Sequence, residues 1–215
     1  TNFNKRLIES WFGHHPSSEV ILNGSDQSAI SNIAPASFDN MFEGRKIWSC
    51  ASSWRPHKRL SENIRYFLET SSDETVMLIA GKGATKNDFL GYEKHINRRI
   101  FYLGHLSWES LISLYKSSEK FIHLSYLDHC PNVVVDAAGS GCEIVCSSTG
   151  GTSEIPAHLK TVIVEDDWDF SPVELYNPPK MDFRNFKILK SEKLKTLSDS
   201  SVKYLNRMER LIEKS

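Results

Sequence analysis

The chain has 215 residues, of which 26 are basic and 27 acidic, and its formal net charge at pH 7 is -1. This length suits one sizeable α/β domain with attached segments, and a second full domain would not fit comfortably. A nearly neutral chain without a concentrated basic stripe is not expected to bind nucleic acid. No apolar run approaches the ~20 residues of a membrane span, and the first residues do not form a signal peptide, so we expect a cytoplasmic protein.

The cysteines show no CxxC pairing, and no histidine cluster has zinc-finger spacing. We expect reduced thiols, with Cys142 and Cys146 packed in a buried strand. Neither a metal ion nor a cofactor is predicted.

Residues 1–45 are predicted to form an N-terminal helix and an interdomain connector. The helix runs from Asn4 to Phe12 and ends at Gly13. A short strand, 20–22, and an Asn23-Gly24 turn follow, and residues 23–45 are polar and irregular.

Residues 46–165 alternate between strands and helices, which is typical of a doubly wound parallel sheet of the Rossmann-like kind. The predicted strands cover 46–51, 75–80, 99–103, 120–126, 143–147 and 161–164, and the predicted helices cover 60–68, 107–115 and 132–138. Within the remaining 166–215, we expect an irregular stretch over 166–197 and a closing helix over 204–212.

The stretch from Asp128 to Asp136 places two carboxylates eight positions apart around a strand-to-helix turn. Ligands of open α/β sheets bind at such carboxyl-end loops. The amides of Asn132 and Val133 fall in the first helical turn, where they are free to bind a phosphate. Asp136 lies one turn after Asn132 on the same face, where its carboxylate suits a vicinal diol.

Each acid taken alone fits a simpler interpretation, as a helix cap or a solvated surface charge. Asp136, however, lies in a helix too apolar for a plain surface element. A buried carboxylate costs several kcal/mol unless it has a partner or a ligand.

Two other loops are predicted at the same sheet edge. Arg55 and Lys58 follow the strand 46–51 and offer two cations for a pyrophosphate, while Gly150 and Gly151 follow the strand 143–147 and allow close backbone approach. Each loop alone also fits solvated charges or a plain turn. A P-loop and a GxGxxG fingerprint are both absent, which argues against a kinase or a dehydrogenase.

Together these segments resemble the retaining GT-B glycosyltransferases of the glycosyltransferase group 1, or family 4, type. Asp128-His-Cys-Pro-Asn-Val-Val-Val-Asp136, followed by Gly141 to Ile155, is similar to the family's EGxPNVxxEAMAxGxPVVxxxxGGxxEI block. The segments 54–58, 20–26 and 100–105 are similar to its donor-phosphate loop, its VIxNGVD segment and its VxFLG strand and turn.

The resemblance implies one half of a GT-B fold that binds a nucleotide sugar. It implies that Lys58 and Arg55 bind the donor diphosphate, Asp128 the sugar hydroxyls and Asp136 the ribose. It further implies donor contacts from backbone groups, namely those of Asn132, Val133, Gly104, Gly150 and Gly151. The family's pair of glutamates is a pair of aspartates here, each shorter by one methylene.

The resemblance also implies an N-terminal acceptor-binding domain, in the same or another chain, and possible peripheral membrane association through it. Our hypothesis is a donor-binding domain of a retaining glycosyltransferase that transfers a hexose-type sugar. The alternatives are a non-catalytic nucleotide-sugar-binding or regulatory module, or another GT-B enzyme such as a sugar-nucleotide epimerase.

Overall fold

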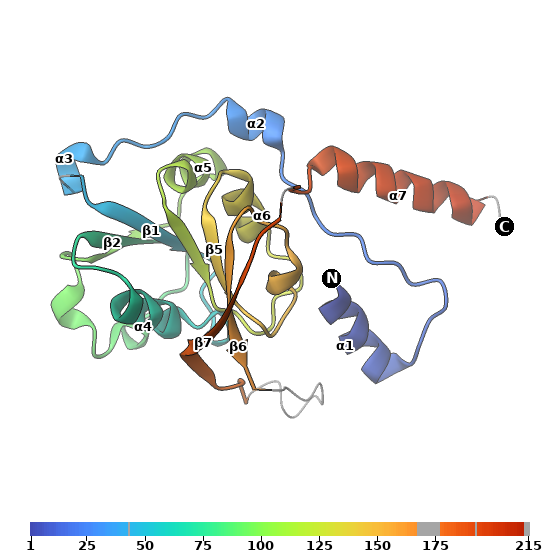
Figure 1. The fold of residues 1–215 in the computed structure, drawn as a ribbon, viewed down its shortest axis with the longest axis horizontal. Helices are drawn as coiled ribbons and strands as arrows, with labels where there is room; N and C mark the ends of the chain where they lie inside the picture. Colours follow the sequence, from blue (N-terminus) through green and yellow to red (C-terminus); the bar gives the residue numbers. More distant parts are fainter. Residues whose placement is uncertain (43, 167–176, 192, 213–215) are drawn as a thin grey trace.

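A seven-stranded sheet runs through the middle of the molecule (Figure 1). The computed structural model describes residues 1–42, 44–166, 177–191 and 193–212. The strand order is β3-β2-β1-β4-β5-β6-β7; the first six strands are parallel to their neighbours, and β7 is antiparallel to β6. The strands are β1 Lys46–Ala51, β2 Thr75–Ala80, β3 Ile100–Gly104, β4 Lys120–His123, β5 Glu143–Ser147, β6 Lys160–Glu165 and β7 Met181–Leu189.

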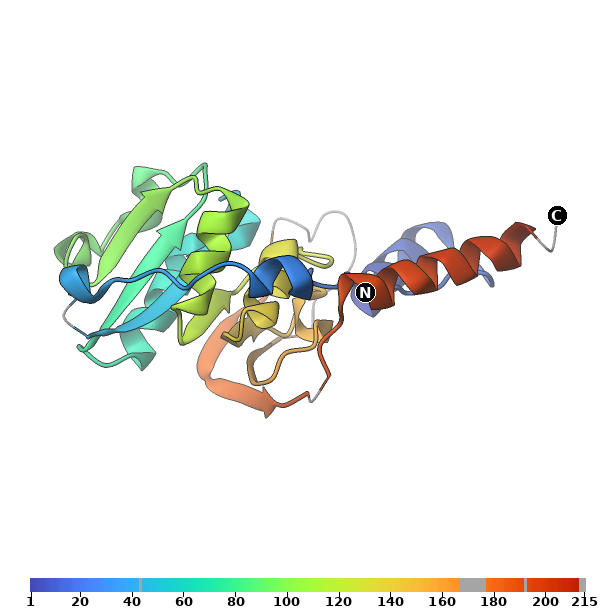
Figure 2. The same cartoon turned by 90° about the horizontal axis from the view of Figure 1, so that it is seen from above.

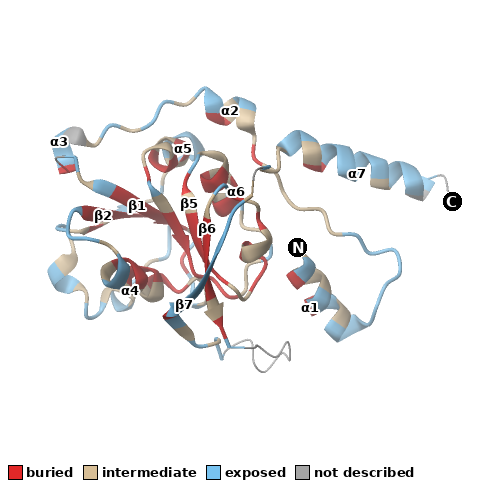
Figure 3. Ribbon diagram, viewed as in Figure 1, coloured by how far each residue is buried: buried red, intermediate tan, exposed pale blue. Residues whose placement is uncertain are grey.

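Helices cover both faces of the sheet, and side chains alternate between the two faces along each strand. In β1, Ile47 and Ala51 pack in the core beneath the helices α5 (Trp108–Lys116) and α6 (Asn132–Gly139). Trp48 and Cys50 pack in the core on the other face, beneath α4 (Leu60–Thr70). The longer helices are α1 Asn2–Phe12, α4 Leu60–Thr70, α5 Trp108–Lys116, α6 Asn132–Gly139 and α7 Leu197–Ile212. Buried residues gather in the central strands and on the sheet-facing sides of α4, α5 and α6, whereas α7 is mostly exposed (Figure 3). The predicted doubly wound, Rossmann-like fold is confirmed.

Short helical turns complete the architecture. The α-helical ones are α2 Gln27–Ser31 and α3 Asp39–Phe42, and the 3₁₀ turns are η1 Pro56–Lys58, η2 Lys86–Phe89, η3 Glu93–His95 and η4 Thr152–Glu154. Predicted strands and helices of the sheet region agree with the structure to within a few residues.

The N-terminal helix α1 is attached to the sheet region through Glu154. The two carboxylate oxygens of this residue accept the backbone amides of Asn2 and Phe3, each at 2.6 Å. A carboxylate at a helix N-terminus satisfies free amides and complements the helix dipole. Away from this contact, α1 and α7 project from the sheet on one side (Figures 1 and 2).

Two predicted elements differ from the structure. Residues 20–22 are not a strand, and the predicted irregular stretch 166–197 contains β7. The sequence of β7 is polar because it is an edge strand whose residues are mostly exposed, so it lacks the apolar alternation of a half-buried strand. Phe183 is the one buried residue of β7. Its ring meets the ring of Tyr66 in α4 edge-on, with the ring centroids 5.1 Å apart.

The closing helix is also longer than predicted, since α7 begins at Leu197. Residues 167–176 of the stretch predicted as irregular lie outside the described residues. The sequence predicts that the nucleotide-sugar-binding unit ends at residue 165. The sheet continues past this residue, because β7 pairs with β6. The division of the chain into three segments stays a prediction. No helix in the described parts of the chain is long and apolar enough to cross a membrane.

Candidate functional site

Asp128 lies at the centre of a polar cluster at the carboxyl edge of β1 and β4. Lys58, in η1 after β1, forms an ion pair with Asp128 Oδ1 through its Nζ. His123, the last residue of β4, places its Nε2 2.5 Å from Asp128 Oδ2. An ionised carboxylate only accepts hydrogen bonds, so the imidazole N–H donates. Both oxygens of Asp128 therefore accept hydrogen bonds, one from the last residue of β4 and one from the η1 turn that follows the neighbouring strand β1.

This arrangement controls the ionisation of Asp128. Burial alone would raise the pKa of the carboxyl, but the hydrogen bonds that His123 and Lys58 donate, together with the positive charge beside the carboxylate, outweigh burial and hold the pKa well below its usual range. The carboxylate is 15% exposed, and the Lys58 side chain is 14% exposed. The site therefore holds a fixed negative charge beside a fixed positive charge at neutral pH.

Asn63 of α4 keeps Lys58 in this position. Its amide group donates to the backbone oxygens of Lys58 at 3.1 Å and Arg59 at 2.6 Å, while its Oδ1 accepts the amide of Leu124 at 3.2 Å. Asn63 is fully buried. One side chain therefore fixes the end of η1 against the end of β4, which carries the loop to Asp128.

The N-terminus of α6 lies directly after Asp128. Pro131 precedes the helix, and the amides of Asn132 and Val133 make no hydrogen bond to another described residue. The Asn132 Oδ1 accepts the side-chain amide of Asn23 at 2.8 Å, which ties the connector to the first turn of α6. The two free amides are available for an anion, as helix N-termini generally are.

Asp136 has the partner that its burial requires. The indole Nε1 of Trp108, at the start of α5, donates to Asp136 Oδ2 at 3.0 Å. Burial raises the pKa of Asp136, and the Trp108 hydrogen bond acts in the opposite direction. Both residues line a pocket of about 540 Å³, together with Asn132 of α6 and Tyr204 of α7. With Asn23 and Asp26 of the connector, the pocket offers two aromatic rings, two side-chain amides and two carboxylates.

The two glycines after β5 pack tightly against the Asp128 loop. The amide of Gly151 donates to the backbone oxygen of Asp128 at 2.6 Å. A Cβ at position 151 would lie 1.8 Å from the backbone oxygen of His129, so no larger residue fits. Gly150 has a φ of +92°, which favours glycine. Gly151 therefore holds the Asp128 loop in place, and its amide is already used.

Two predicted site residues stand apart from this cluster. Arg55 is exposed and makes no ion pair with a described residue. Gly104 ends β3, two strands away from β1, and its backbone oxygen accepts the amide of Gly81 at 2.7 Å. The structure thus pairs Lys58 with Asp128 and places Asn132 and Asp136 in the wall of one pocket. Arg55 and Gly104 lie outside both groups.

Sequence reasoning missed His123 and Trp108, which supply the partners of the two aspartates. His123 interrupts an otherwise apolar buried strand, and a polar residue at the end of such a strand is the signal that identifies it. Trp108 carries no such signal, because an aromatic residue at a helix start fits ordinary packing. Among the described residues, no group of three or more His, Cys, Asp or Glu side chains is placed to hold a metal ion.

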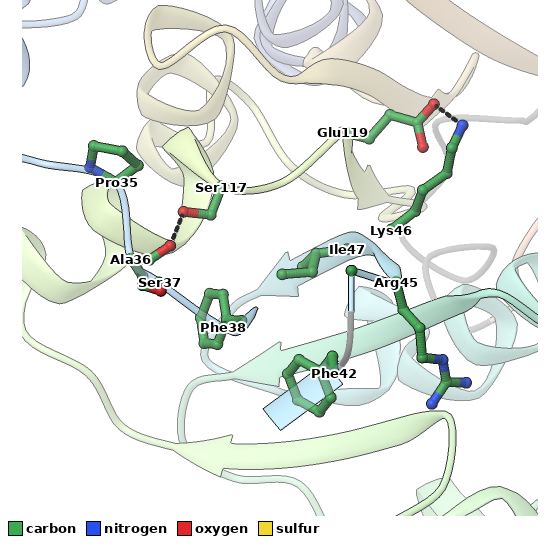
Figure 4. A pocket seen from close by; sticks show the side chains of 11 residues that line it. Pro35, Ala36, Ser37, Phe38, Phe42, Arg45, Lys46, Ile47, Ser117 and Glu119 are labelled. Carbon is green, nitrogen blue, oxygen red and sulfur yellow. Dashed lines mark hydrogen bonds and ion pairs between the residues drawn. The ribbon is translucent and has the colours of Figure 1, made fainter. Parts of the chain in front are cut away.

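Another pocket lies at the opposite edge of the sheet (Figure 4). It has a volume of about 640 Å³ and is lined by connector residues 35–38, the start of β1 and the end of α5. Lys46 and Glu119 form an ion pair of 3.1 Å across it, and Ser117 donates to the backbone oxygen of Ala36 at 2.6 Å. This pocket is larger than the pocket at Asp136, so pocket volume alone does not identify the candidate site.

Comparison with known proteins agrees with this architecture. The family model described as "Glycosyl transferases group 1" matches residues 38–170. An uncharacterized glycosyltransferase of Methanocaldococcus jannaschii is 30% identical over 84 residues, which are 38% of this chain and 22% of that protein.

Solved structures share the fold at low sequence identity. Sucrose-phosphate synthase from Thermosynechococcus elongatus is 15% identical with a TM-score of 0.63, over 78% of this chain and 44% of that one. AviGT4, a glycosyltransferase involved in avilamycin A biosynthesis, is 17% identical with a TM-score of 0.61, over 98% of this chain and 63% of that one. The chain spans less than two thirds of the length of each of these relatives.

The sheet and its helices are those of a Rossmann-like domain of the GT-B class of glycosyltransferases. Because the family model covers well over half of its residues, the chain belongs to the glycosyl transferases group 1 family.

Proposed function

We propose that this chain is the donor-binding domain of a retaining glycosyltransferase that uses a nucleoside-diphosphate sugar. The observation that carries the proposal is the ion pair of Lys58 and Asp128 beside the free amides of α6. A cation and unpaired amides suit a diphosphate, while an ionised carboxylate suits the hydroxyls of a sugar. These three groups meet within one loop cluster at the carboxyl edge of the sheet, where open α/β sheets bind ligands.

In this proposal each residue of the site has a separate role. Lys58 and the amides of Asn132 and Val133 bind the diphosphate, and the exposed Arg55 reaches it from the loop before η1. Asp128 accepts hydrogen bonds from the sugar, and Asp136 accepts them from the ribose inside the 540 Å³ pocket. The leaving diphosphate is stabilised by fixed positive charge and amide dipoles, which act most strongly in a partly buried site.

The remaining predicted contacts have lesser roles. Gly150 and Gly151 act by positioning the Asp128 loop, and Gly104 shapes the neighbouring loop after β3. Acceptor recognition and transfer are assigned to a second, N-terminal domain. The chain spans less than two thirds of the length of its matched relatives, so the organisation of the whole protein is part of the proposal.

A related structure supports the choice of ligand. The Anabaena protein HepE, solved in complex with UDP-glucose, matches this chain with 18% identity and a TM-score of 0.50, over 65% of this chain and 41% of that one. At this identity the likeness concerns the fold, so the ligand enters as a proposal.

The second candidate function is a nucleotide-sugar-binding module without turnover. The shortened carboxylates favour it, because both oxygens of the short Asp128 side chain already accept hydrogen bonds from His123 and Lys58. Assays of transfer and of donor hydrolysis, in the chain joined to an acceptor-binding domain, distinguish the two. Binding without either reaction would support the module.

Calorimetry with UDP and GDP tests donor binding directly. A charge-assisted hydrogen bond is worth ~1.5–3 kcal/mol, so Lys58→Ala should weaken binding roughly ten- to a hundredfold. Lys46→Ala is the matched control, since that lysine lies at the opposite edge of the sheet and pairs with Glu119. Equal affinity in the wild-type chain and Lys58→Ala would refute the diphosphate assignment.

A further inference from the structure

His123 is the most deeply buried member of the Asp128 cluster. Its side chain is 3% exposed, compared with 15% for Asp128. The imidazole lies nearly parallel to the ring of Phe121, with an interplanar angle of 13° and centroids 6.3 Å apart. Its Nε2 approaches Asp128 Oδ2 to 2.5 Å from inside the sheet, while Lys58 approaches the other oxygen from the loop side. The two partners of Asp128 therefore differ in setting: His123 ends a buried strand, whereas Lys58 extends a flexible four-carbon side chain from the η1 turn.

Lys58 has a second role in the proposed function, on which this inference rests. A diphosphate carries more negative charge than one carboxylate, so it draws the ammonium group of Lys58 toward itself. Asp128 then loses part of the positive charge that compensates its burial. A buried carboxylate with weakened compensation costs several kcal/mol, unless the remaining partner compensates for the loss.

We propose that His123 is a positioning residue for donor binding. When Lys58 turns to the diphosphate, the His123–Asp128 pair takes up a proton from solvent, and the resulting imidazolium holds the carboxylate in place for the sugar. Withdrawal of a cation and arrival of an anion both favour the protonated form of the pair. The proton belongs to the pair as a coupled system, so donor binding is linked to proton uptake.

Two other histidines compete for that proton. His57 precedes Lys58 in η1, and His129 follows Asp128 in the loop. Burial lowers the pKa of both; Lys58 also lowers them, and Asp128 raises them. Arg55 also lowers the pKa of His57. Either imidazole can gain a proton when a diphosphate arrives, so the experiment must separate the three.

Calorimetry of the whole chain in two buffers of different ionisation enthalpy, near pH 7, measures proton uptake on binding UDP or GDP. The wild-type chain is expected to take up a fraction of a proton per nucleotide. His123→Gln keeps an N–H donor but cannot be protonated, and it should abolish most of this uptake. The controls His57→Gln and His129→Gln should retain it. Binding without uptake in the wild-type chain, or equal uptake in His123→Gln, would overturn the inference.

A second measurement needs neither nucleotide nor a His123 variant. NMR titration of the histidine rings in the ligand-free chain compares the wild type with Lys58→Met, which removes the ammonium group permanently. The His123 ring is expected to titrate at higher pH in Lys58→Met, and an unchanged titration would overturn the inference. If UDP and GDP do not bind, the proposed function is contradicted. The NMR titration then tests the inference about His123 without the calorimetry.

Discussion

The guanidinium of Arg59 forms a buried ion pair with the carboxylate of Glu165, and it joins the residue after η1 to the end of β6. Arg59 adopts a φ of +52° and lies over the ring of Tyr126, 4.5 Å from its centroid. Its Nη2 also donates to the backbone oxygen of Pro179 at 2.7 Å. Because Arg59 is adjacent to Lys58, this pair fixes the backbone that presents the site lysine.

Breaking this pair should destabilise the fold strongly. The two side chains are 4% and 0% exposed, and loss of one partner of a buried pair typically costs about 3–5 kcal/mol. We expect a loss of this size in the free energy of unfolding of Arg59→Met, measured by urea denaturation. Lys46→Met, which opens an exposed pair with Glu119, should change it by less than about 1 kcal/mol. Similar losses in the two variants would contradict the assigned role.

The stability of the chain should depend on the ionisation of Asp128. A carboxyl whose folded-state pKa is depressed adds stability above its unfolded pKa, and this stability is lost as pH falls through the folded pKa. With an unfolded pKa of ~3.9, the stability difference between wild type and Asp128→Asn should shrink as the pH falls below about 5. Denaturation curves over this range measure the difference. A difference that stays constant into the acid range would show that the carboxylate is not held ionised.

Trp108 should contribute to donor binding through Asp136. Trp108→Phe keeps an aromatic ring but removes the indole N–H that Asp136 accepts at 3.0 Å. A hydrogen bond worth about 1 kcal/mol predicts roughly fivefold weaker binding of UDP or GDP, measured by calorimetry. The double variant with Asp136→Asn should lose less than the sum of the two single losses, since the two residues act as one unit. Additive losses in binding free energy would show that Trp108 and Asp136 act independently.

Gly151→Ala should disturb the Asp128 loop by steric conflict alone. The added Cβ would lie 1.8 Å from the backbone oxygen of His129, so the loop must move. We expect a loss of about 1–3 kcal/mol in stability and weaker nucleotide binding. Gly141→Ala is the control: its φ of +100° strains alanine, but no atom lies within 4 Å of the new Cβ. It should lower the melting temperature and leave nucleotide affinity unchanged.

The central strands of the sheet could be predicted from sequence because they are buried on both faces. Continuous apolar runs such as 75–80 mark parallel strands whatever their partners. The strand β7 escaped prediction because an exposed edge strand carries charges where a central strand carries apolar residues. Its assignment depends on pairing with β6, which lies outside the local sequence.

The candidate site was predictable only in part, for a related reason. Lys58 and Asp128 lie in loops at strand ends, so their shared edge follows from the topology of a parallel sheet. His123 belongs to a strand, where its side chain direction depends on the pleat and the register. The hydrogen bond to Asp128 depends on both the pleat and the strand register, and the spacing of residues in the sequence specifies neither of them. Gly151 was expected to present its amide to a ligand, whereas the structure uses that amide to bind Asp128.

The attachment of α1 through Glu154 has a consequence for the geometry of the site. Glu154 closes the η4 turn that follows Gly151, and Gly151 in turn holds the backbone of Asp128. Phe3 of α1 also lies against His129, with ring centroids 6.4 Å apart. The first helix therefore contacts the Asp128 loop along two routes, one through Glu154 and Gly151 and one through His129. These contacts place α1, the first element of the chain, among the supports of the backbone that carries the Asp128 carboxylate.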